Sequence, residues 1–88
     1  MKTIVVTGTS SGIGYEICTQ AANLSYNVIS ISRNIEPLSK VNGVESHSVD
    51  ITDKKSISDF VEDLSKRNIK IDILINNAGQ LSNELFSE

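Results

Sequence analysis

The sequence predicts an α/β fold in which four parallel strands form a doubly wound sheet in the order 3-2-1-4. Short β-branched runs alternate with segments whose apolar residues recur every three or four positions, and a glycine-rich stretch separates the first strand from the first helix. No internal repeat or low-complexity segment competes with this pattern. The 88 residues allow one domain at most.

The first half of the chain contains two predicted strands and the helix between them. Ile4-Val5-Val6 is a β-branched run that ends at Gly8, which is typical of a strand buried on both faces. The second strand covers residues 27–32. Between the strands, apolar side chains at helical spacing are expected to face the sheet: Ile13, Ile17, Ala21 and Leu24.

The second crossover is short. Pro37 favours the first turn of a short helix that runs to Lys40 or Val41, and Asn42-Gly43 supplies the turn that ends it. The third strand is expected from Val44 to Asp50, where apolar and polar residues alternate.

The last predicted helix has the clearest periodicity in the chain. Thr52 or Asp53 caps its N-terminus, and it ends near Lys66-Arg67, where cations suit a helix C-terminus. The fourth strand follows from Ile71 to Ile75. Four apolar side chains at i, i+3, i+4 and i+7 form the helix's buried stripe: Ile57, Phe60, Val61 and Leu64.

Composition excludes several classes of function. A net charge of -3 and a pI near 5.0 leave no basic stripe for nucleic acid, so we expect no nucleic-acid partner. Apolar runs of about five residues fall short of the roughly 20 that span a bilayer, so we expect a cytoplasmic protein without a membrane partner. The single Cys18 is expected to be a buried apolar residue. His47 has no acidic or cysteine partner at ligand spacing, so we predict a structural role for it and no metal site.

The glycine-rich stretch from Thr7 to Gly14 has the position that a phosphate-binding turn requires. Gly8 permits a tight turn, Gly12 permits close approach of the backbone to a pyrophosphate, and Gly14 lets the helix pack near the strand. The helix N-terminus then offers unpaired N–H groups to the anion. A turn without a ligand is the alternative, and the absence of a Lys followed by Ser or Thr excludes a nucleoside-triphosphate loop.

Two motifs together resemble the short-chain dehydrogenase/reductase family. The stretch from Thr7 to Gly14 reads Thr-Gly-x-x-x-Gly-x-Gly, and the predicted fourth strand ends in Asn-Asn-Ala-Gly at residues 76–79. The resemblance covers essentially the whole chain and corresponds to the first third of a family member. It implies that residues 1–88 are one partial NAD(P)-binding domain with a Rossmann-like sheet truncated after its fourth strand, without the C-terminal catalytic half.

The resemblance also implies a cofactor and the residues that contact it. Ser32 stands where an acidic side chain would select NAD, and the following Arg33 favours the 2′-phosphate of NADP; an exposed loop cation is the alternative. Asp50 is expected to accept from the adenine amino group, with a helix cap as the alternative. The expected cofactor-binding residues are Gly8, Ser10, Ser11, Gly12, Ile13, Gly14, Ser32, Arg33, Asp50, Ile51, Asn76, Ala78 and Gly79.

The family's catalytic residues are not expected among the 88. Neither Tyr15 nor Tyr26 begins the Tyr-x-x-x-Lys pattern that the family uses to move a proton. The resemblance therefore implies the NADP(H)-binding portion of an oxidoreductase that transfers hydride between the nicotinamide and a carbonyl or alcohol, with the isolated chain inactive and substrate bound only by a full-length form. A non-catalytic dinucleotide-binding module and an inactive truncated product remain as alternatives.

The predicted topology also favours self-association. The fourth strand lies at the edge of the predicted sheet, where Ile71, Ile73 and Ile75 are expected to lack a neighbouring strand. Two of the three crossovers fall on one face, which leaves a single helix to cover the other. We expect a homo-oligomer that pairs or covers the fourth strands.

Overall fold

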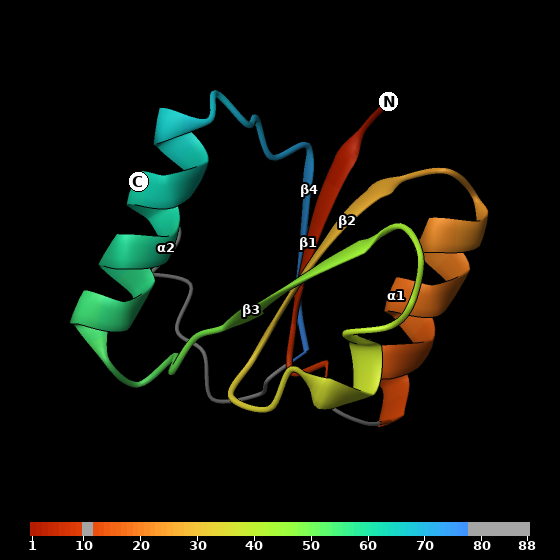
Figure 1. Cartoon of the computed structure of the whole chain (residues 1–88), viewed down its shortest axis with the longest axis horizontal. Helices are drawn as coiled ribbons and strands as arrows, with labels where there is room; N and C mark the ends of the chain where they lie inside the picture. The colour runs from red at the N-terminus through yellow and green to blue at the C-terminus, as the bar shows by residue number, and fades with distance from the viewer. Residues whose placement is uncertain (10–11, 78–88) are drawn as a thin grey trace.

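A computed structural model describes residues 1–9 and 12–77 of the chain. In this part of the chain four strands alternate with two α-helices and one short 3-10 helix (Figure 1). The elements are β1 (Thr3–Thr7), α1 (Gly12–Asn23), β2 (Asn27–Ser32), η1 (Glu36–Leu38), β3 (Val44–Ser48), α2 (Lys54–Lys66) and β4 (Ile73–Asn76).

The four strands form one parallel sheet in the order β3-β2-β1-β4, which confirms the predicted fold class and strand order. Val5 at the centre of β1 pairs with Ile29 on one side and Leu74 on the other. Parallel neighbours require crossovers, and the helices supply them. The sheet therefore has the doubly wound arrangement in which loops gather at the carboxyl ends of the strands.

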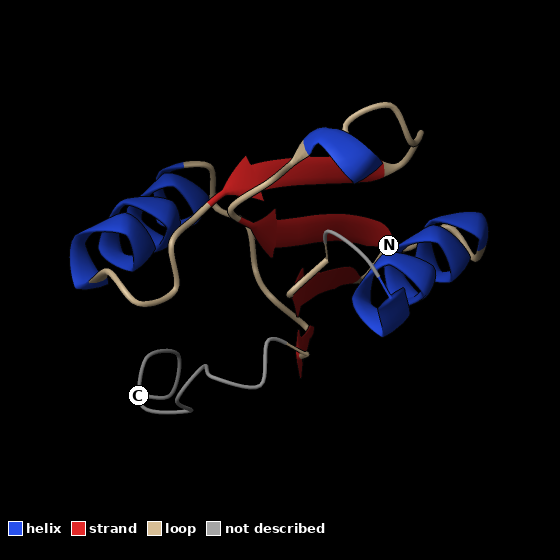
Figure 2. Ribbon diagram, turned by 90° about the horizontal axis from the view of Figure 1, so that it is seen from below, coloured by secondary structure: helices blue, strands red, loops and turns tan. Residues whose placement is uncertain are grey.

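The core is divided between the two faces of the sheet, as Figure 2 shows by its helices on either side of the strands. Successive strand residues point to opposite faces, so Val5 packs on the α2 side while its neighbours Ile4 and Val6 pack on the α1 side. Leu38 of η1 joins the α1 side, which leaves the other face to α2. The α1-side cluster is Ile4, Val6, Cys18, Ala21, Val28 and Leu38; the α2-side cluster is Val5, Ile29, Ile31, Val49, Ile57, Phe60 and Leu64.

The predicted buried stripe of α1 is correct at Ala21, which is buried, and at Ile17, which packs partly against the α1-side cluster, and wrong at Ile13 and Leu24. Gly14, Cys18 and Ala21 face the sheet, whereas Ile13 is 70% exposed and Leu24, which lies beyond the end of the helix, is 73% exposed. The cause is Gly14: this position approaches the β1 turn so closely that a Cβ would lie 2.2 Å from the Gly8 carbonyl oxygen. Its close approach sets which face of the helix meets the sheet.

Helix α2 agrees more closely with the prediction. Asp53 is its N-cap and accepts a hydrogen bond from the Lys55 N–H at 3.0 Å, and the helix ends at Lys66 as expected. Val61 is the exception, because its side chain is 46% exposed while the other three residues of the predicted stripe are buried. The short helix also differs, since it ends at Leu38 instead of Lys40 or Val41.

Two strand boundaries differ from the expected ones. β3 ends at Ser48, two residues early, because the Asp50 carboxylate accepts hydrogen bonds from Thr52 and turns the chain toward α2. β4 begins at Ile73, two residues late, and runs to Asn76. Asp72 precedes it, and its carboxylate accepts from the Thr3 N–H at 2.9 Å.

Four charged or titratable side chains form an ion cluster between β3 and α2, which we call the β3–α2 cluster: Glu45, His47, Asp63 and Arg67. Residues 45 and 47 share the α2 face of β3, and the His47 ring packs edge-on against Phe60 at 5.0 Å. Its Nε2 lies 2.5 Å from the Glu45 carboxylate, so the expectation that His47 has no acidic partner is wrong.

Arg67 completes this cluster as the C-cap of α2. Its guanidinium binds the Glu45 carboxylate and lies 3.0 Å from that of Asp63. The hydrogen bond from Arg67 is the main cause that lowers the pKa of Glu45, and His47 adds to it. Ligand atoms of Glu45, His47 and Asp63 lie within 4.8 Å of one another, but Arg67 already supplies a cation to both carboxylates. We therefore interpret the cluster as an ion network, in line with the structural role predicted for His47.

Cys18 is fully buried, and burial raises the pKa of its thiol to about 11. The side chain therefore stays protonated and packs as a small apolar group, which confirms its predicted role. Among the described helices, none is both long enough and apolar enough to cross a bilayer.

Candidate cofactor-binding site

The carboxyl ends of the four strands meet at one edge of the sheet, at the bottom of Figure 1, and we call this the carboxyl edge. Because all strands are parallel, the turn after β1, the loop after β2 and the ends of β3 and β4 converge there. In open α/β sheets ligands bind at this edge, beside the position where strand order reverses. Here that position is β1, from which the chain passes outward to β2 and later returns to β4.

The glycine turn is built by three glycines with three different surroundings. Gly8 (φ 67°) turns the chain at the end of β1, and its N–H donates to the Ile31 carbonyl at 3.0 Å. Gly12 (φ 68°) begins α1, and a Cβ at this position would meet nothing within 4 Å. Gly14 contacts the turn so closely that no side chain fits. The structure thus places open space at Gly12, where the unpaired N–H groups of a helix N-terminus attract an anion.

The end of β4 is tied to this turn by three hydrogen bonds. The Thr7 hydroxyl donates to the Asn76 side-chain oxygen at 3.2 Å and accepts from the Asn77 N–H at 3.0 Å. The Asn77 side chain then donates to the Gly8 carbonyl at 3.1 Å. These bonds join residues about 70 positions apart in the chain, so they fix the position of the turn relative to the centre of the sheet.

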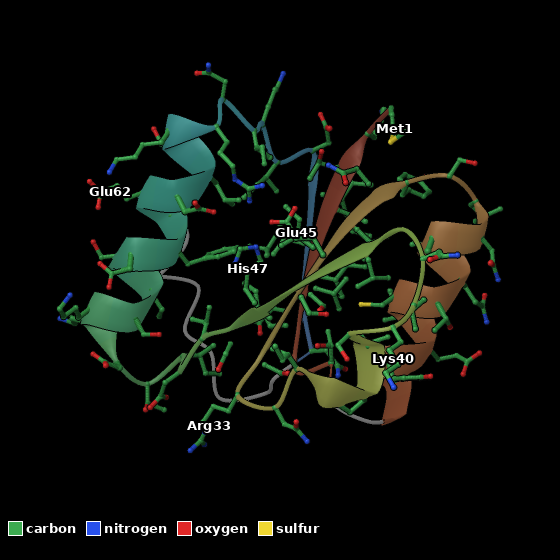
Figure 3. The ribbon with its side chains drawn as sticks, in the orientation of Figure 1. Met1, Arg33, Lys40, Glu45, His47 and Glu62 are labelled. Atoms are coloured by element: carbon green, nitrogen blue, oxygen red, sulfur yellow. The ribbon has the colours of Figure 1, made fainter. Side chains whose placement is uncertain are left out.

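The loop after β2 carries Ser32 and Arg33 to the same edge. The Val49 N–H donates to the Ser32 carbonyl at 3.0 Å, and the Ser32 hydroxyl donates to the Asn34 carbonyl at 2.6 Å. The Ser48 hydroxyl donates to the Arg33 carbonyl at 3.2 Å. The backbone is therefore held from two directions, while the Arg33 side chain extends outward from the edge (Figure 3).

Asp50 lies beyond the end of β3 with its carboxylate bonded locally. It accepts from the Thr52 hydroxyl at 2.6 Å and from the Thr52 N–H at 2.9 Å. These two bonds, and to a smaller degree the charge of Arg33, lower the pKa of Asp50. Ile51 turns inward and packs partly against the α2-side cluster.

The structure brings most of the predicted site residues to one edge. Ile13 is exposed beside the open space at Gly12, and Asn76 lies at the end of β4. Four predicted residues lie outside the described part of the chain: Ser10, Ser11, Ala78 and Gly79.

Three residues that shape the site are not among the predicted cofactor-binding residues. The sequence does indicate Thr7 and Asn77, since both belong to the motifs that mark the turn and the end of β4. Ser48 carries no signal in the sequence, because its bond to the Arg33 carbonyl joins two loops that only the folded sheet brings together.

A family model described as short chain dehydrogenase matches residues 2–88, nearly the whole chain. The chain belongs to the short-chain dehydrogenase family. This confirms the resemblance, and the related proteins are oxidoreductases. An uncharacterized oxidoreductase of Staphylococcus saprophyticus is 34% identical to this chain in an alignment of 96 positions that covers 99% of this chain and 41% of that relative.

Solved structures of short-chain dehydrogenases share the fold. A metagenomic short-chain oxidoreductase in complex with NADP superposes with a TM-score of 0.75 at 31% identity over 88% of this chain and 38% of its own. A short-chain dehydrogenase of Leptospira borgpetersenii with bound NAD+ gives a TM-score of 0.78 at 34% identity over 85% of this chain and 30% of its own. The chain thus spans well under half the length of these relatives, and the two neighbours bind different dinucleotides.

Proposed function

We propose that residues 1–88 form one partial dinucleotide-binding domain that holds NADP(H) for an oxidoreductase of the short-chain dehydrogenase family. The observation that carries this proposal is the open space at Gly12, between the glycine turn and the N-terminus of α1. A pyrophosphate fits there, because backbone N–H groups are the donors and no Cβ obstructs their approach. The bonds from Thr7 and Asn77 support the site by holding the turn in place before any ligand arrives.

In this proposal the pyrophosphate lies against the turn and the start of α1. The backbone of Gly8, Gly12 and Gly14 provides the surface, and Ile13 contributes an exposed apolar side chain beside it. Ser10 and Ser11 belong to the same stretch and are proposed to offer hydroxyl donors to phosphate oxygens. The helix dipole adds a favourable interaction with negative charge at this end.

Arg33 is the proposed selector of NADP over NAD. Among residues 1–9 and 12–77, no carboxylate forms an ion pair with its guanidinium, although its charge acts on Asp50. The 2′-phosphate of NADP offers an anion of matching geometry, whereas the 2′-hydroxyl of NAD does not. Because Arg33 is exposed, screening limits the expected preference to roughly tenfold in Kd. Solved neighbours with NADP and with NAD+ show that both cofactors occur on this fold.

The remaining site residues are proposed to contact the adenosine half of the cofactor. Ser32 meets the ribose next to Arg33, and Asp50 accepts from the adenine amino group with the carboxylate oxygen or lone pair that Thr52 leaves open. Ile51 lies beside the adenine, and the segment Asn76, Ala78 and Gly79 follows the ribose.

When bound, the nicotinamide supplies hydride transfer to or from a carbonyl or alcohol carbon. The residues of this chain bind and orient the dinucleotide, and none of the 88 supplies a Tyr-x-x-x-Lys proton donor. We propose that substrate is bound only when further protein is present, and that the 88 residues alone give no turnover. Cofactor binding alone does not lower the barrier to reaction.

We also propose self-association through β4. Within the described residues this strand pairs on one side only, with β1. Leu74 within it and Ile71 just before it are 41% and 38% exposed, whereas Ile73 and Ile75 pack partly against the α1-side cluster. An unpaired edge with exposed apolar side chains recruits another strand. Sedimentation velocity over a dilution series tests this, and a folded monomer at all concentrations contradicts it. The cytoplasmic location expected from the sequence stays a prediction.

Isothermal titration of the 88-residue chain with NADP+ and with NAD+ tests the proposal, after circular dichroism has established that the chain is folded. We expect both to bind, with NADP+ tighter by about tenfold. Saturable binding with the opposite preference would contradict the selector role of Arg33 but not the site. A folded chain that binds neither nucleotide at millimolar concentration would contradict the proposed function itself.

A further inference from the structure

The loop that carries Arg33 is held by a hydroxyl from a different strand. Ser48 is the last residue of β3 and stands in register with Ser32, the last residue of β2. Its hydroxyl donates to the Arg33 carbonyl at 3.2 Å. Among the described residues, this bond links a side chain of another element to the Arg33 peptide itself, whereas the neighbouring bonds act on Ser32 and Asn34.

We propose that Ser48 is a positioning residue for cofactor selection: it holds the Arg33 peptide so that the guanidinium is directed toward a 2′-phosphate. This inference rests on the proposed function, because it assumes that Arg33 selects NADP. A hydroxyl has one hydrogen, and that of Ser48 is given to the Arg33 carbonyl. In this arrangement Ser48 acts through Arg33 and is not itself a donor to the phosphate.

The neighbouring bonds explain why this one hydroxyl matters. The Val49 N–H fixes the Ser32 carbonyl, and the Ser32 hydroxyl closes the turn onto the Asn34 carbonyl. Both bonds act on the residues beside Arg33, so without Ser48 the Arg33 peptide keeps rotational freedom between two fixed neighbours. A long side chain amplifies such rotation at its tip, and ordering it again on binding reduces the affinity.

The same bond contributes little to the stability of the fold. Ser48 and Arg33 are both exposed, so water replaces the lost hydrogen bond when the hydroxyl is removed. The expected signature is therefore a change of cofactor preference without a change of stability. Ser46 provides a matched control, since it lies on the same strand and face and bonds the hydroxyl of Ser30, which is 2% exposed. Ser46→Ala leaves that buried hydroxyl without its acceptor and should lower stability without changing the preference.

The test measures the Kd of NADP+ and of NAD+ by titration calorimetry for the wild-type chain and for Ser48→Ala, Ser46→Ala, Arg33→Ala and the double variant Ser48→Ala with Arg33→Ala. Ser48→Ala should weaken NADP+ about two- to fivefold, with NAD+ and the melting temperature unchanged. In the Arg33→Ala background the same substitution should have no further effect, which is the coupling that a positioning role requires.

Other outcomes overturn the inference in distinguishable ways. If Arg33→Ala removes the preference and Ser48→Ala does not change it, Ser48 has no positioning role and the proposed function stands. A loss of NADP+ affinity with Ser48→Ala that persists in the Arg33→Ala background would mean that the Ser48 hydroxyl contacts the cofactor directly. If Arg33→Ala leaves NADP+ binding unchanged, the selector itself is wrong and nothing is left to position. Should Ser48→Ala fail to fold, Ser48→Thr and Ser48→Val repeat the comparison, because they match in shape and only Thr keeps the hydroxyl.

Discussion

Two arginines of this chain lie in contrasting surroundings. Arg67 at the end of α2 binds the carboxylates of Glu45 and Asp63, so its charge is neutralised within the protein. Arg33 at the carboxyl edge has its backbone held by Ser48 and forms no ion pair with a carboxylate among the described residues, while its side chain points outward (Figure 3). The first arrangement serves the fold, and the second suits an external anion.

The same contrast holds between the β3–α2 cluster, which contains Arg67, and the carboxyl edge, which carries Arg33. In the β3–α2 cluster the charged side chains pair with one another, and removing Arg67 leaves the Glu45 and Asp63 carboxylates close together without a cation. At the carboxyl edge the side chains of Thr7, Asn77, Ser32 and Ser48 bond to backbone groups: the Thr7 hydroxyl accepts from a backbone N–H, and the other three donate to backbone carbonyls. They hold the loops and leave the outer surface open at Gly12. Changes at the edge should therefore alter binding, and changes in the cluster should alter stability.

Gly12→Val is expected to have the largest effect on binding. Its Cβ would enter the open space proposed for the pyrophosphate, so both NADP+ and NAD+ should bind at least ~100-fold more weakly by calorimetry. The strained φ of 68° should also cost about 1–2 kcal/mol of stability. Gly43→Val is the control, because Gly43 (φ 88°) also has a positive φ and lies far from the turn; a Cβ there would in addition lie 3.3 Å from the Ala22 Cβ. Equal loss of affinity in both variants would mean that strain alone explains the result.

Arg33→Ala is expected to have the next largest effect. It should weaken NADP+ binding roughly tenfold and leave NAD+ affinity unchanged, because the 2′-phosphate loses its cation. The melting temperature should not move, since no carboxylate of the described residues pairs with Arg33. Calorimetry and a thermal melt on the same sample measure both quantities. A fall in stability with no change in NADP+ affinity would assign Arg33 to the fold and abolish the contrast with Arg67.

Arg67→Ala should give the reverse pattern. The Glu45 and Asp63 carboxylates would be left close together without their shared cation, so the melting temperature should fall by a few degrees. Affinity for either nucleotide should stay unchanged, because the cluster lies away from the carboxyl edge. High salt should reduce the difference from wild type. A selective loss of NADP+ binding in this variant would show that the two regions are coupled.

The smallest expected effect is a pH dependence of stability that originates in Glu45. Its pKa is lowered from 4.5 in the folded chain, mainly by the hydrogen bond from Arg67. A lowered pKa means that the folded state binds the proton less readily than the unfolded state. The stabilisation is therefore complete above the ordinary Glu pKa and is lost as the pH falls through the folded value. Urea melts from pH 6 to pH 3 should show a steeper fall for wild type than for Glu45→Gln, and parallel curves would contradict this.

Much of the fold is encoded locally in the sequence. The β-branched run from Ile4 to Val6 and the stripe of Ile57, Phe60 and Leu64 predicted their elements correctly, because periodicity reports the buried face directly. The buried face of α1 was predicted only in part, at Ile17 and Ala21, since it is set by the close approach of Gly14 to Gly8, a contact that periodicity does not report. The early end of β3 follows in the same way from the local bonds of Asp50.

The candidate site, like the fold, was predictable from the sequence only in part. The motifs located the turn and the end of β4, because their residues are adjacent in sequence. The contacts between distant residues were not predictable, since Ser48 meets Arg33, and Glu45 meets Arg67, only through the packing of separate elements. Local patterns thus predict the position of the site, whereas tertiary contacts determine which arginine forms ion pairs within the protein.

The most direct test of the central claim is an amide chemical-shift titration of the uniformly 15N-labelled chain with NADP+. We predict saturable shifts at Gly8, Gly12, Gly14 and Arg33, with the amides of Glu45, His47 and Arg67 unaffected. Titration with NAD+ should reproduce the shifts of the glycine turn but not the full shift at Arg33. Shifts centred on the β3–α2 cluster, or a folded chain with none at saturating nucleotide, would contradict the assignment of the carboxyl edge as the dinucleotide site.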